Sequence, residues 1–201
     1  GNKKAVNKLH EMSFLVYNLV IFPMIAGILI VNNDFVQFFL GQDFQDARYA
    51  IAIMVFRMFF IGWTNIMGIQ ILIPHNRNRE FMLSTTIPAI FSVGLNLILI
   101  PPLGYIGASI VSVVTEGLVW LIQLYFTSDY LKEVKILPSM LKILLAAFLM
   151  YGALYFIKTF INFSSVVNVL ICSVLGFLVY GGLVLILRIL DFQELKSIIK
   201  K

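Results

Sequence analysis

The sequence predicts an all-α integral membrane protein with six transmembrane helices. Of its 201 residues, 60% are hydrophobic and 12% are charged, whereas globular proteins average about 45–50% and about 25%. A mean hydropathy of +0.95 leaves too few polar side chains to cover a compact body in water. This composition excludes a soluble enzyme, a disordered chain and a secreted disulfide-linked domain. The single cysteine, Cys172, cannot form an internal disulfide.

Six apolar stretches are each long enough for a membrane helix, which needs roughly 20 such residues and satisfies its own backbone polar groups. They are residues 14–31, 50–73, 82–100, 106–126, 141–157 and 166–187. Short segments with turn-forming residues, such as Pro74 and Gly104, separate them. Within these stretches the charged residues are Arg57, Glu116 and Lys142.

The segments outside these stretches predict interfacial elements. Residues 32–49 combine four phenylalanines with three aspartates, which predicts a short helix lying in the outer membrane interface. Residues 127–139 are expected along the inner face, and residues 190–201 as an amphipathic tail. We therefore divide the chain into two parts. Residues 1–126 hold four transmembrane helices, and residues 127–201 hold a cytoplasmic connector, two additional transmembrane helices and a basic tail.

The basic residues predict the orientation, because cytoplasmic loops of membrane proteins carry an excess of Lys and Arg. With the N-terminus in the cytoplasm and six crossings, twelve basic residues lie inside and two lie outside. The outside pair is Arg48 and Lys158, and the inside set is Lys3, Lys4, Lys8, Arg77, Arg79, Lys132, Lys135, Lys142, Arg188, Lys196, Lys200 and Lys201. Both termini are therefore expected in the cytoplasm. We assign the net charge of +5 to this topology and to anionic membrane lipids, and expect no nucleic-acid partner.

Polar side chains within the apolar stretches indicate function, because a helix in lipid does not need them. At 100° per residue, Arg57, Thr64 and Gly68 lie within about 20° of one face, with Asn65 at its edge. Two further stretches carry such lines: Thr85, Ser92 and Asn96 in one, and Ser109, Ser112, Glu116 and Gln123, beside Trp120, in the next. Three helices with one polar face each predict a shared hydrated cavity.

Glu116 lies near the predicted membrane midplane, because it is ten residues into its stretch, or about 15 Å at about 1.5 Å per residue. Two interpretations stay open for it. Glu116 and Arg57 form a structural ion pair, or Glu116 takes up and releases a proton as relay carboxylates of transporters do.

Motifs for reaction chemistry are absent from the sequence. There is no GxxxxGK[ST], HExxH, CxxC, EF-hand loop or GxSxG, and His10 and His75 stand far apart. We therefore expect no metal site, no cofactor and no enzymatic activity.

Several short motifs resemble one family of membrane transporters. They are residues 62–74 (GWTNIMGIQILIP), 77–81, 96–101 (NLILIP), 104–109 (GYIGAS), 112–116 (SVVTE) and 39–44 (FLGQDF) with Ala47. In this order, they resemble the carboxy-terminal half of the Wzx-type oligosaccharide and polysaccharide flippases of the multidrug/oligosaccharidyl-lipid/polysaccharide transporter superfamily. The likeness covers most of residues 14–126, and residues 141–187 match only in kind, as the extra helix pair of longer members.

The resemblance implies that this chain is the ninth to fourteenth helices of a protein with 12–14 helices in two lobes, so that one lobe and the start of the second are absent here. Members of the family move undecaprenyl-pyrophosphate-linked sugar units across the bacterial cytoplasmic membrane by alternating access. By this likeness Glu116 and Asn96 fall on motif positions. We add Arg57 as a pyrophosphate contact, and Asn65, Asn96, Ser112 and Gln123 as hydrogen-bonding residues for the sugar or headgroup.

Two other functions remain open at this point. The first is a drug or cation antiporter of the same superfamily, which would favour an acidic cavity. The second is a membrane subunit without transport activity, in complex with a polysaccharide polymerase, whose polar faces would contact that partner protein.

Overall fold

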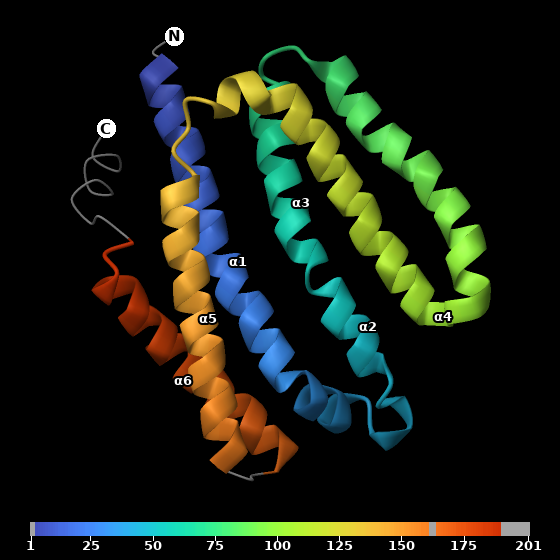
Figure 1. Ribbon diagram of the computed structural model, residues 1–201, viewed down its shortest axis with the longest axis vertical. Helices are drawn as coiled ribbons and strands as arrows, with labels where there is room; N and C mark the ends of the chain where they lie inside the picture. Colours follow the sequence, from blue (N-terminus) through green and yellow to red (C-terminus); the bar gives the residue numbers. More distant parts are fainter. Residues whose placement is uncertain (1–2, 161–163, 190–201) are drawn as a thin grey trace.

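The computed structural model describes residues 3–160 and 164–189, and it is helical throughout this part, with no strand (Figure 1). In chain order the elements are α1 (Lys3–Phe39), the 3-10 turn η1 (Gln42–Phe44), α2 (Ala47–Met54), α3 (Arg57–Asn65), the π-helix η2 (Ile66–Leu72), α4 (Asn78–Leu131), α5 (Leu137–Phe160) and α6 (Ser165–Ile186). The predicted tail over residues 190–201 lies outside the described residues.

Five helical stretches of the described chain are long and apolar enough to cross a membrane. They are α1, the continuous run α2–α3–η2, α4, α5 and α6. The all-helical membrane architecture is therefore confirmed. The prediction of six helices differs in one place, because it divides α4 into two.

Helix α4 has 54 residues, or about 80 Å of straight helix, which is far more than the roughly 30 Å hydrocarbon core of a bilayer. It reverses direction at Gly104, whose φ of 54° and ψ of −131° are not helical, and Pro101 and Pro102 precede this turn. Figure 1 shows the two arms, residues 78–103 and 105–131, running in opposite directions. We call them the first and second arms of α4.

Gly107 allows the two arms to come close together just after the turn. A Cβ atom on Gly107 would lie 2.3 Å from the Leu99 carbonyl oxygen, a distance that a side chain does not tolerate. Glycine is thus required at position 107 by packing.

Residues 32–49 do not form the predicted short helix of their own, because α1 continues through Phe39; their place at the outer membrane interface stays a prediction. Two polar residues that suggested a turn, Asn32 and Asp34, contact residues of other helices. Asn32 donates to the Arg48 carbonyl at 2.7 Å, and Asp34 is paired with Lys158. The helix ends where Gly41 adopts a φ of 84°, which favours glycine.

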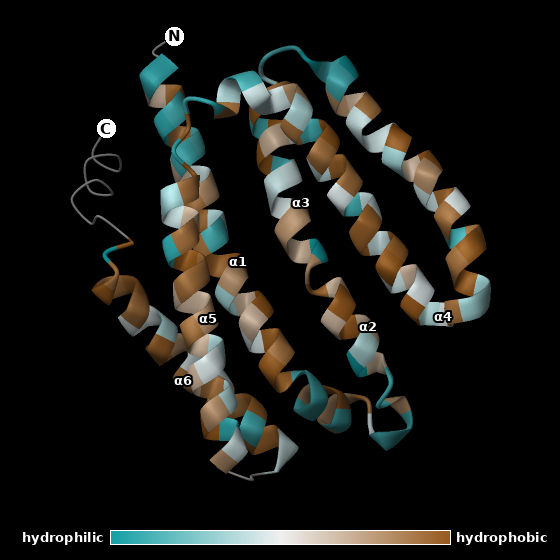
Figure 2. Cartoon of the chain, viewed as in Figure 1, coloured by the Kyte–Doolittle hydropathy of each residue, from teal (hydrophilic) through white to brown (hydrophobic). Residues whose placement is uncertain are grey.

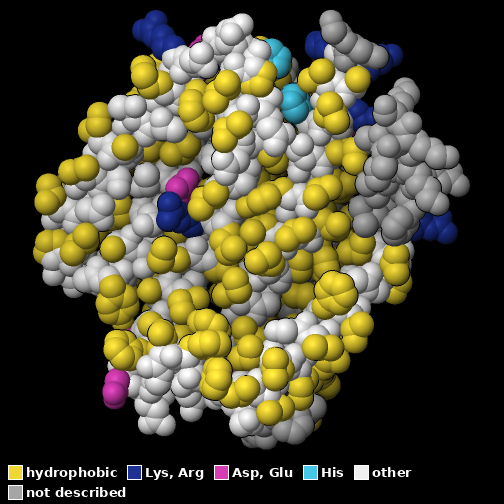
Figure 3. All heavy atoms as spheres, turned by 180° about the vertical axis from the view of Figure 1, so that it is seen from behind, with side chains coloured by type: hydrophobic (Ala, Val, Ile, Leu, Met, Phe, Trp, Pro, Cys, Tyr) yellow, Lys and Arg dark blue, Asp and Glu magenta, His cyan; other side chains and the backbone are white. Residues whose placement is uncertain are grey.

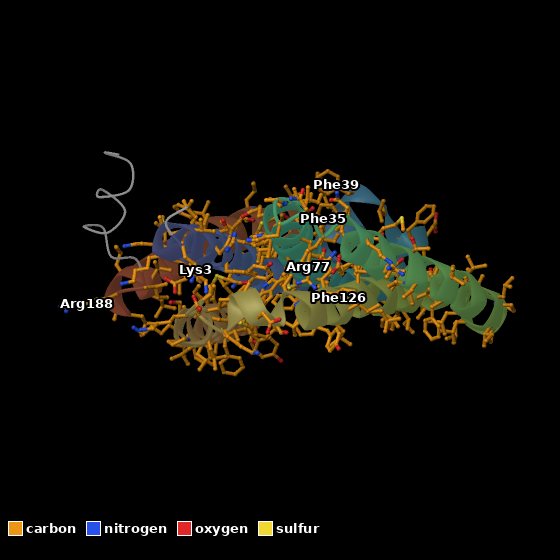
Figure 4. The ribbon with its side chains drawn as sticks, turned by 90° about the horizontal axis from the view of Figure 1, so that it is seen from above. Lys3, Phe35, Phe39, Arg77, Phe126 and Arg188 are labelled. Atoms are coloured by element: carbon orange, nitrogen blue, oxygen red, sulfur yellow. The ribbon has the colours of Figure 1, made fainter. Side chains whose placement is uncertain are left out.

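Three parts of the chain meet at one end of the bundle, which we call the basic end. Figure 1 places there the start of α1, the α3–α4 connection and the α4–α5 connection. Lys3 forms an ion pair of 2.8 Å with Glu133, and the Lys135 N–H donates to Glu11 at 2.8 Å. Figure 2 shows hydrophilic residues at both ends of the bundle and a hydrophobic middle. Figure 4 looks onto the basic end, where the Arg77 guanidinium donates to the Phe126 carbonyl at 2.6 Å.

Helix α1 packs against α5 and α6 on one side and against α3 on the other. On one side Ala26 and Ile30 belong to an apolar cluster with residues of α5 and α6, such as Met150 and Val184. On the other side Phe14 packs with Trp63 of α3. At the opposite end, α1, α5 and α6 are joined by polar contacts: Lys158 lies 2.5 Å from Asp34, and Asn168 donates to Asp34 at 3.0 Å.

Replacement of Gly107 by Val is expected to lower the stability of the protein by about 1–3 kcal/mol, because the added side chain separates the two arms of α4. The control is Gly94→Ala, since a Cβ atom there meets nothing within 4 Å and alanine favours a helix. Thermal unfolding in detergent measures both variants. Equal melting temperatures for the two would contradict the proposed close approach.

The Glu133 carboxylate has a pKa below its ordinary value, first because Lys3 and Asn7 donate hydrogen bonds to it and also because Lys3 is positively charged. A lowered pKa means that the contact stabilises the fold above the ordinary pKa and is lost as the pH falls through the lowered one. We expect an NMR titration of the Glu133 carboxyl carbon to show this lowered pKa. In Lys3→Gln it should rise toward the ordinary value, and no rise would contradict the assignment.

Candidate functional site

An ion pair joins α3 to the second arm of α4 in the middle of the apolar part of the chain. The Arg57 guanidinium donates to Glu116 Oε1 through Nη2 at 2.8 Å and through Nε at 3.2 Å. The Arg57 side chain is 38% exposed and that of Glu116 is 21% exposed. The sequence-based interpretation of these two residues as partners agrees with this geometry, and their part in transport stays a prediction.

Aromatic side chains also pack α3 against the second arm of α4. One turn beyond Glu116, the Trp120 ring lies 5.7 Å from Phe60 and 6.1 Å from Phe59, both on α3. Figure 3 shows basic and acidic groups next to each other within a mainly hydrophobic face. With 38% of the Arg57 side chain and 21% of the Glu116 side chain exposed, the pair is partly accessible.

The polar line predicted along residues 57–68 faces the line predicted along the second arm of α4 at two positions. The first is the contact between Arg57 and Glu116. At the second, a Cβ atom on Gly68 would lie 3.0 Å from the Gln123 amide nitrogen and 2.6 Å from the Phe81 ring. Gly68 thus lets the π-helix η2 approach both arms of α4.

Gln123 is buried in this second contact rather than facing solvent. It is 1% exposed, and its amide donates to Ser84 of the first arm at 3.2 Å. One turn later, the Thr127 hydroxyl donates to the Gln123 carbonyl at 2.7 Å. The bond between Gln123 and Ser84 thus connects the two arms of α4 through polar side chains.

The other predicted site residues bond within their own helices. Thr64 and Asn65 both donate to the Ile61 carbonyl at 2.9 Å, and Thr64 is buried whereas Asn65 is exposed. Three more belong to α4. Ser109 is buried and donates to the Tyr105 carbonyl, Asn96 is half-buried and donates to Ser92, and Ser112 is half-buried.

A second buried polar contact was not singled out from the sequence. Asn18 of α1 is 1% exposed and accepts a hydrogen bond of 2.9 Å from the Trp63 indole. The signal was present, because Asn18 is a polar residue inside the first apolar stretch. The pair of Asp34 and Lys158 was also missed, and the distance between them in the sequence left no local signal.

Two apolar grooves lie beside α1 and away from the ion pair. One, of about 480 Å³, is lined by α1, α3 and α5 and includes Phe22, Tyr151 and Phe56, the residue before α3. The other, of about 540 Å³, lies between α1, α5 and α6 and includes Gly27 and Gly176. Neither groove is lined by Arg57 or Glu116.

Nothing in residues 3–160 and 164–189 resembles a metal centre, because these residues contain no group of three or more His, Cys, Asp or Glu side chains that could hold an ion. The chemistry of the site is therefore that of an accessible cation and its counter-ion. The fold and this site define a polytopic helical membrane protein with one intramembrane ion pair between its described residues.

Comparison with known proteins relates this fold to a flippase. No protein-family model matches the chain. It is 26% identical over 201 residues to the uncharacterized membrane protein MJ1068 of Methanocaldococcus jannaschii, which covers 100% of this chain and 39% of that protein. The structure is similar to the lipid II flippase MurJ in its inward closed conformation, with a TM-score of 0.80 and 17% identity over 93% of this chain and 40% of that chain.

The chain thus spans 39% and 40% of the lengths of these two proteins. The similarity to the flippase shows the fold alone. The prediction of a flippase-type helical membrane fold is confirmed at this level, and Wzx-type specificity and the place in a carboxy-terminal half stay predictions.

Replacement of Arg57 by Met is expected to lower stability by about 1–3 kcal/mol, because it leaves the Glu116 carboxylate without its partner; the partial exposure of the pair keeps the effect below that of a fully buried one. The double variant Arg57→Met/Glu116→Met should lose less than either single variant. Thermal unfolding in detergent measures the cycle. Additive losses would contradict direct coupling between the two side chains.

Proposed function

We propose that this chain is part of a membrane flippase that moves lipid-linked oligosaccharides by alternating access. The observation that carries the proposal is the accessible Arg57–Glu116 pair within a fold similar to that of a lipid II flippase. An intramembrane charge has a high desolvation cost and is most often functional. A guanidinium in this position suits the phosphate groups of a lipid-linked sugar, whereas the polyprenyl tail would stay in lipid.

The chain is proposed as the carboxy-terminal portion of a longer protein of 12–14 helices, which its partial coverage of both relatives supports. The remainder of that protein would form the other wall of a cavity facing Arg57. Counting the two arms of α4 separately gives six crossings, with the basic end and both termini in the cytoplasm. Because the matched relative is archaeal, we propose the cytoplasmic membrane without restriction to bacteria.

The predicted site residues divide into two groups under this proposal. Asn65, Asn96 and Ser112 are exposed or half-buried and are proposed to bond the sugar or headgroup. Thr64, Ser109 and Gln123 are buried and are proposed to hold the helices in register. No bond of the substrate is made or broken, so the activity is proposed to be transport without catalysis and without a cofactor.

The test is lipid translocation in proteoliposomes that contain the longest natural form of the protein. A fluorescent undecaprenyl-pyrophosphate oligosaccharide is the substrate, and a membrane-impermeant quencher measures its movement between leaflets. Arg57→Ala should slow translocation at least about tenfold, because a hydrogen bond to a charged group is worth about 1.5–3 kcal/mol and 1.36 kcal/mol is tenfold in rate. Arg79→Ala is the control, since Arg79 is exposed at the basic end.

Three results would contradict the proposal. Transport of a cationic dye in place of the lipid would favour an antiporter. Absence of any transport, together with capture of a polysaccharide polymerase, would favour an assembly subunit. Unchanged lipid translocation in Arg57→Ala at normal expression would remove Arg57 from the site.

A further inference from the structure

The two hydrogen bonds of Arg57 converge on a single oxygen. Nε and Nη2 both donate to Glu116 Oε1, and Glu116 is the hydrogen-bond partner of Arg57 among the described residues. In the strongest arginine pairs, two N–H groups donate to two different oxygens of the anion. The guanidinium is thus neutralised by Glu116 without using its full set of donors, and 38% of its side chain is exposed.

A donor without a partner lies one helical turn further along the same face. Trp120 Nε1 is buried and makes no hydrogen bond to the described residues. Trp120 follows Glu116 by four residues in α4, so the two side chains lie on the same face of the helix. Contacts with Trp63, at 6.2 Å between ring centroids, and with Phe60 hold this ring in place.

A buried N–H group without an acceptor is unfavourable and calls for an explanation. The acceptor one turn before Trp120 is Glu116, whose carboxyl is now held on Arg57. A carboxyl group that left Arg57 would find the indole N–H within the same face of α4. Both the carboxylate and the carboxylic acid can accept such a bond.

We propose that Glu116 is an exchangeable counter-ion: it holds Arg57 in the empty protein, yields it to a phosphate group of the lipid substrate, and then accepts the Trp120 indole N–H. This inference rests on the proposed function and adds the order of contacts made by Arg57, Glu116 and Trp120. A phosphate presents two oxygens to the guanidinium. It can therefore accept two N–H groups of Arg57 on two different oxygens, whereas Glu116 accepts both on one. Arg57 stays paired with an anion throughout, and no bare cation is left among the apolar helices.

The experiment measures binding by calorimetry to the longest natural form of the protein in nanodiscs. The probes are farnesyl pyrophosphate, inorganic pyrophosphate and farnesol, so that the phosphate and the lipid tail are tested separately. Farnesyl pyrophosphate should bind most tightly. Equal binding of inorganic pyrophosphate would overturn the lipid headgroup as the source of the phosphate, and equal binding of farnesol would overturn phosphate recognition.

Glu116→Gln is expected to bind farnesyl pyrophosphate about 3- to 10-fold more tightly, because it removes the negative charge that competes with the phosphate for Arg57. The expected gain in affinity corresponds to the strength of a partly exposed ion pair. Arg57→Gln should bind at least about tenfold more weakly. The control is Glu80→Gln, which removes a carboxylate at the basic end that pairs with Arg77, the residue before α4, and it should leave the affinity unchanged.

Trp120→Phe keeps an aromatic ring and removes the indole N–H that would donate a hydrogen bond to the Glu116 carboxyl. This variant should therefore bind farnesyl pyrophosphate about threefold more weakly. In a Glu116→Ala background the same change should have no effect, since no carboxyl group then needs a second position. An unchanged loss in that background would overturn the role of Trp120.

The outcomes separate this inference from the proposed function. If Glu116→Gln weakens binding as Arg57→Gln does, Glu116 positions Arg57 and the exchange is wrong, whereas lipid translocation by the wild type still supports the flippase. If neither variant changes the affinity while the wild type translocates lipid, the exchange is also wrong. If the wild type neither binds nor translocates the lipid, both proposals fail.

Discussion

A guanidinium and a carboxylate 2.8 Å apart constrain how α3 packs against the second arm of α4. Separating the two charges in an apolar surrounding would leave each without compensation for its lost hydration. The register of the two helices follows from this pairing. It brings Phe59 and Phe60 against Trp120, and it brings Gly68 against Gln123 two turns closer to the basic end. The turn at Gly104 sets a second alignment, that of the two arms of α4 with each other.

Helix α1 carries the remaining packing. Its apolar side chains contact α5 and α6 on one side and α3 on the other, and polar contacts stabilise it at both ends. Glu11 accepts from the α4–α5 connector at the basic end, and Asp34 pairs with Lys158 at the opposite end. Because α5 and α6 are attached to α1, they do not cover Arg57, and 38% of the Arg57 side chain stays exposed.

Much of the fold was predictable because few kinds of backbone structure can cross a bilayer. Apolar length predicted the helices, and Gly104 after two prolines predicted the turn within α4. The end of α1 was not predictable in this way. Asn32 and Asp34 are turn-forming residues by local preference, and their partners Arg48 and Lys158 are supplied by other helices. The π-helix at residues 66–72 was equally hidden, since its hydrogen-bond pattern leaves no simple signal in composition.

The sequence by itself determined that the chain is a helical membrane protein and that Arg57 and Glu116 are its two charged residues deep within apolar stretches. Such residues stand out in a sequence because the cost of removing a charge from water makes them rare in membrane helices. Only the tertiary structure decided that two N–H groups of Arg57 donate to one oxygen of Glu116. It also decided that Gln123 and Thr64 are buried in helix contacts rather than open to solvent, and that the Trp120 N–H has no partner among the described residues. Helical periodicity defines which face a side chain is on. It does not define the neighbouring helix on that face, because that choice depends on contacts between residues far apart in the chain.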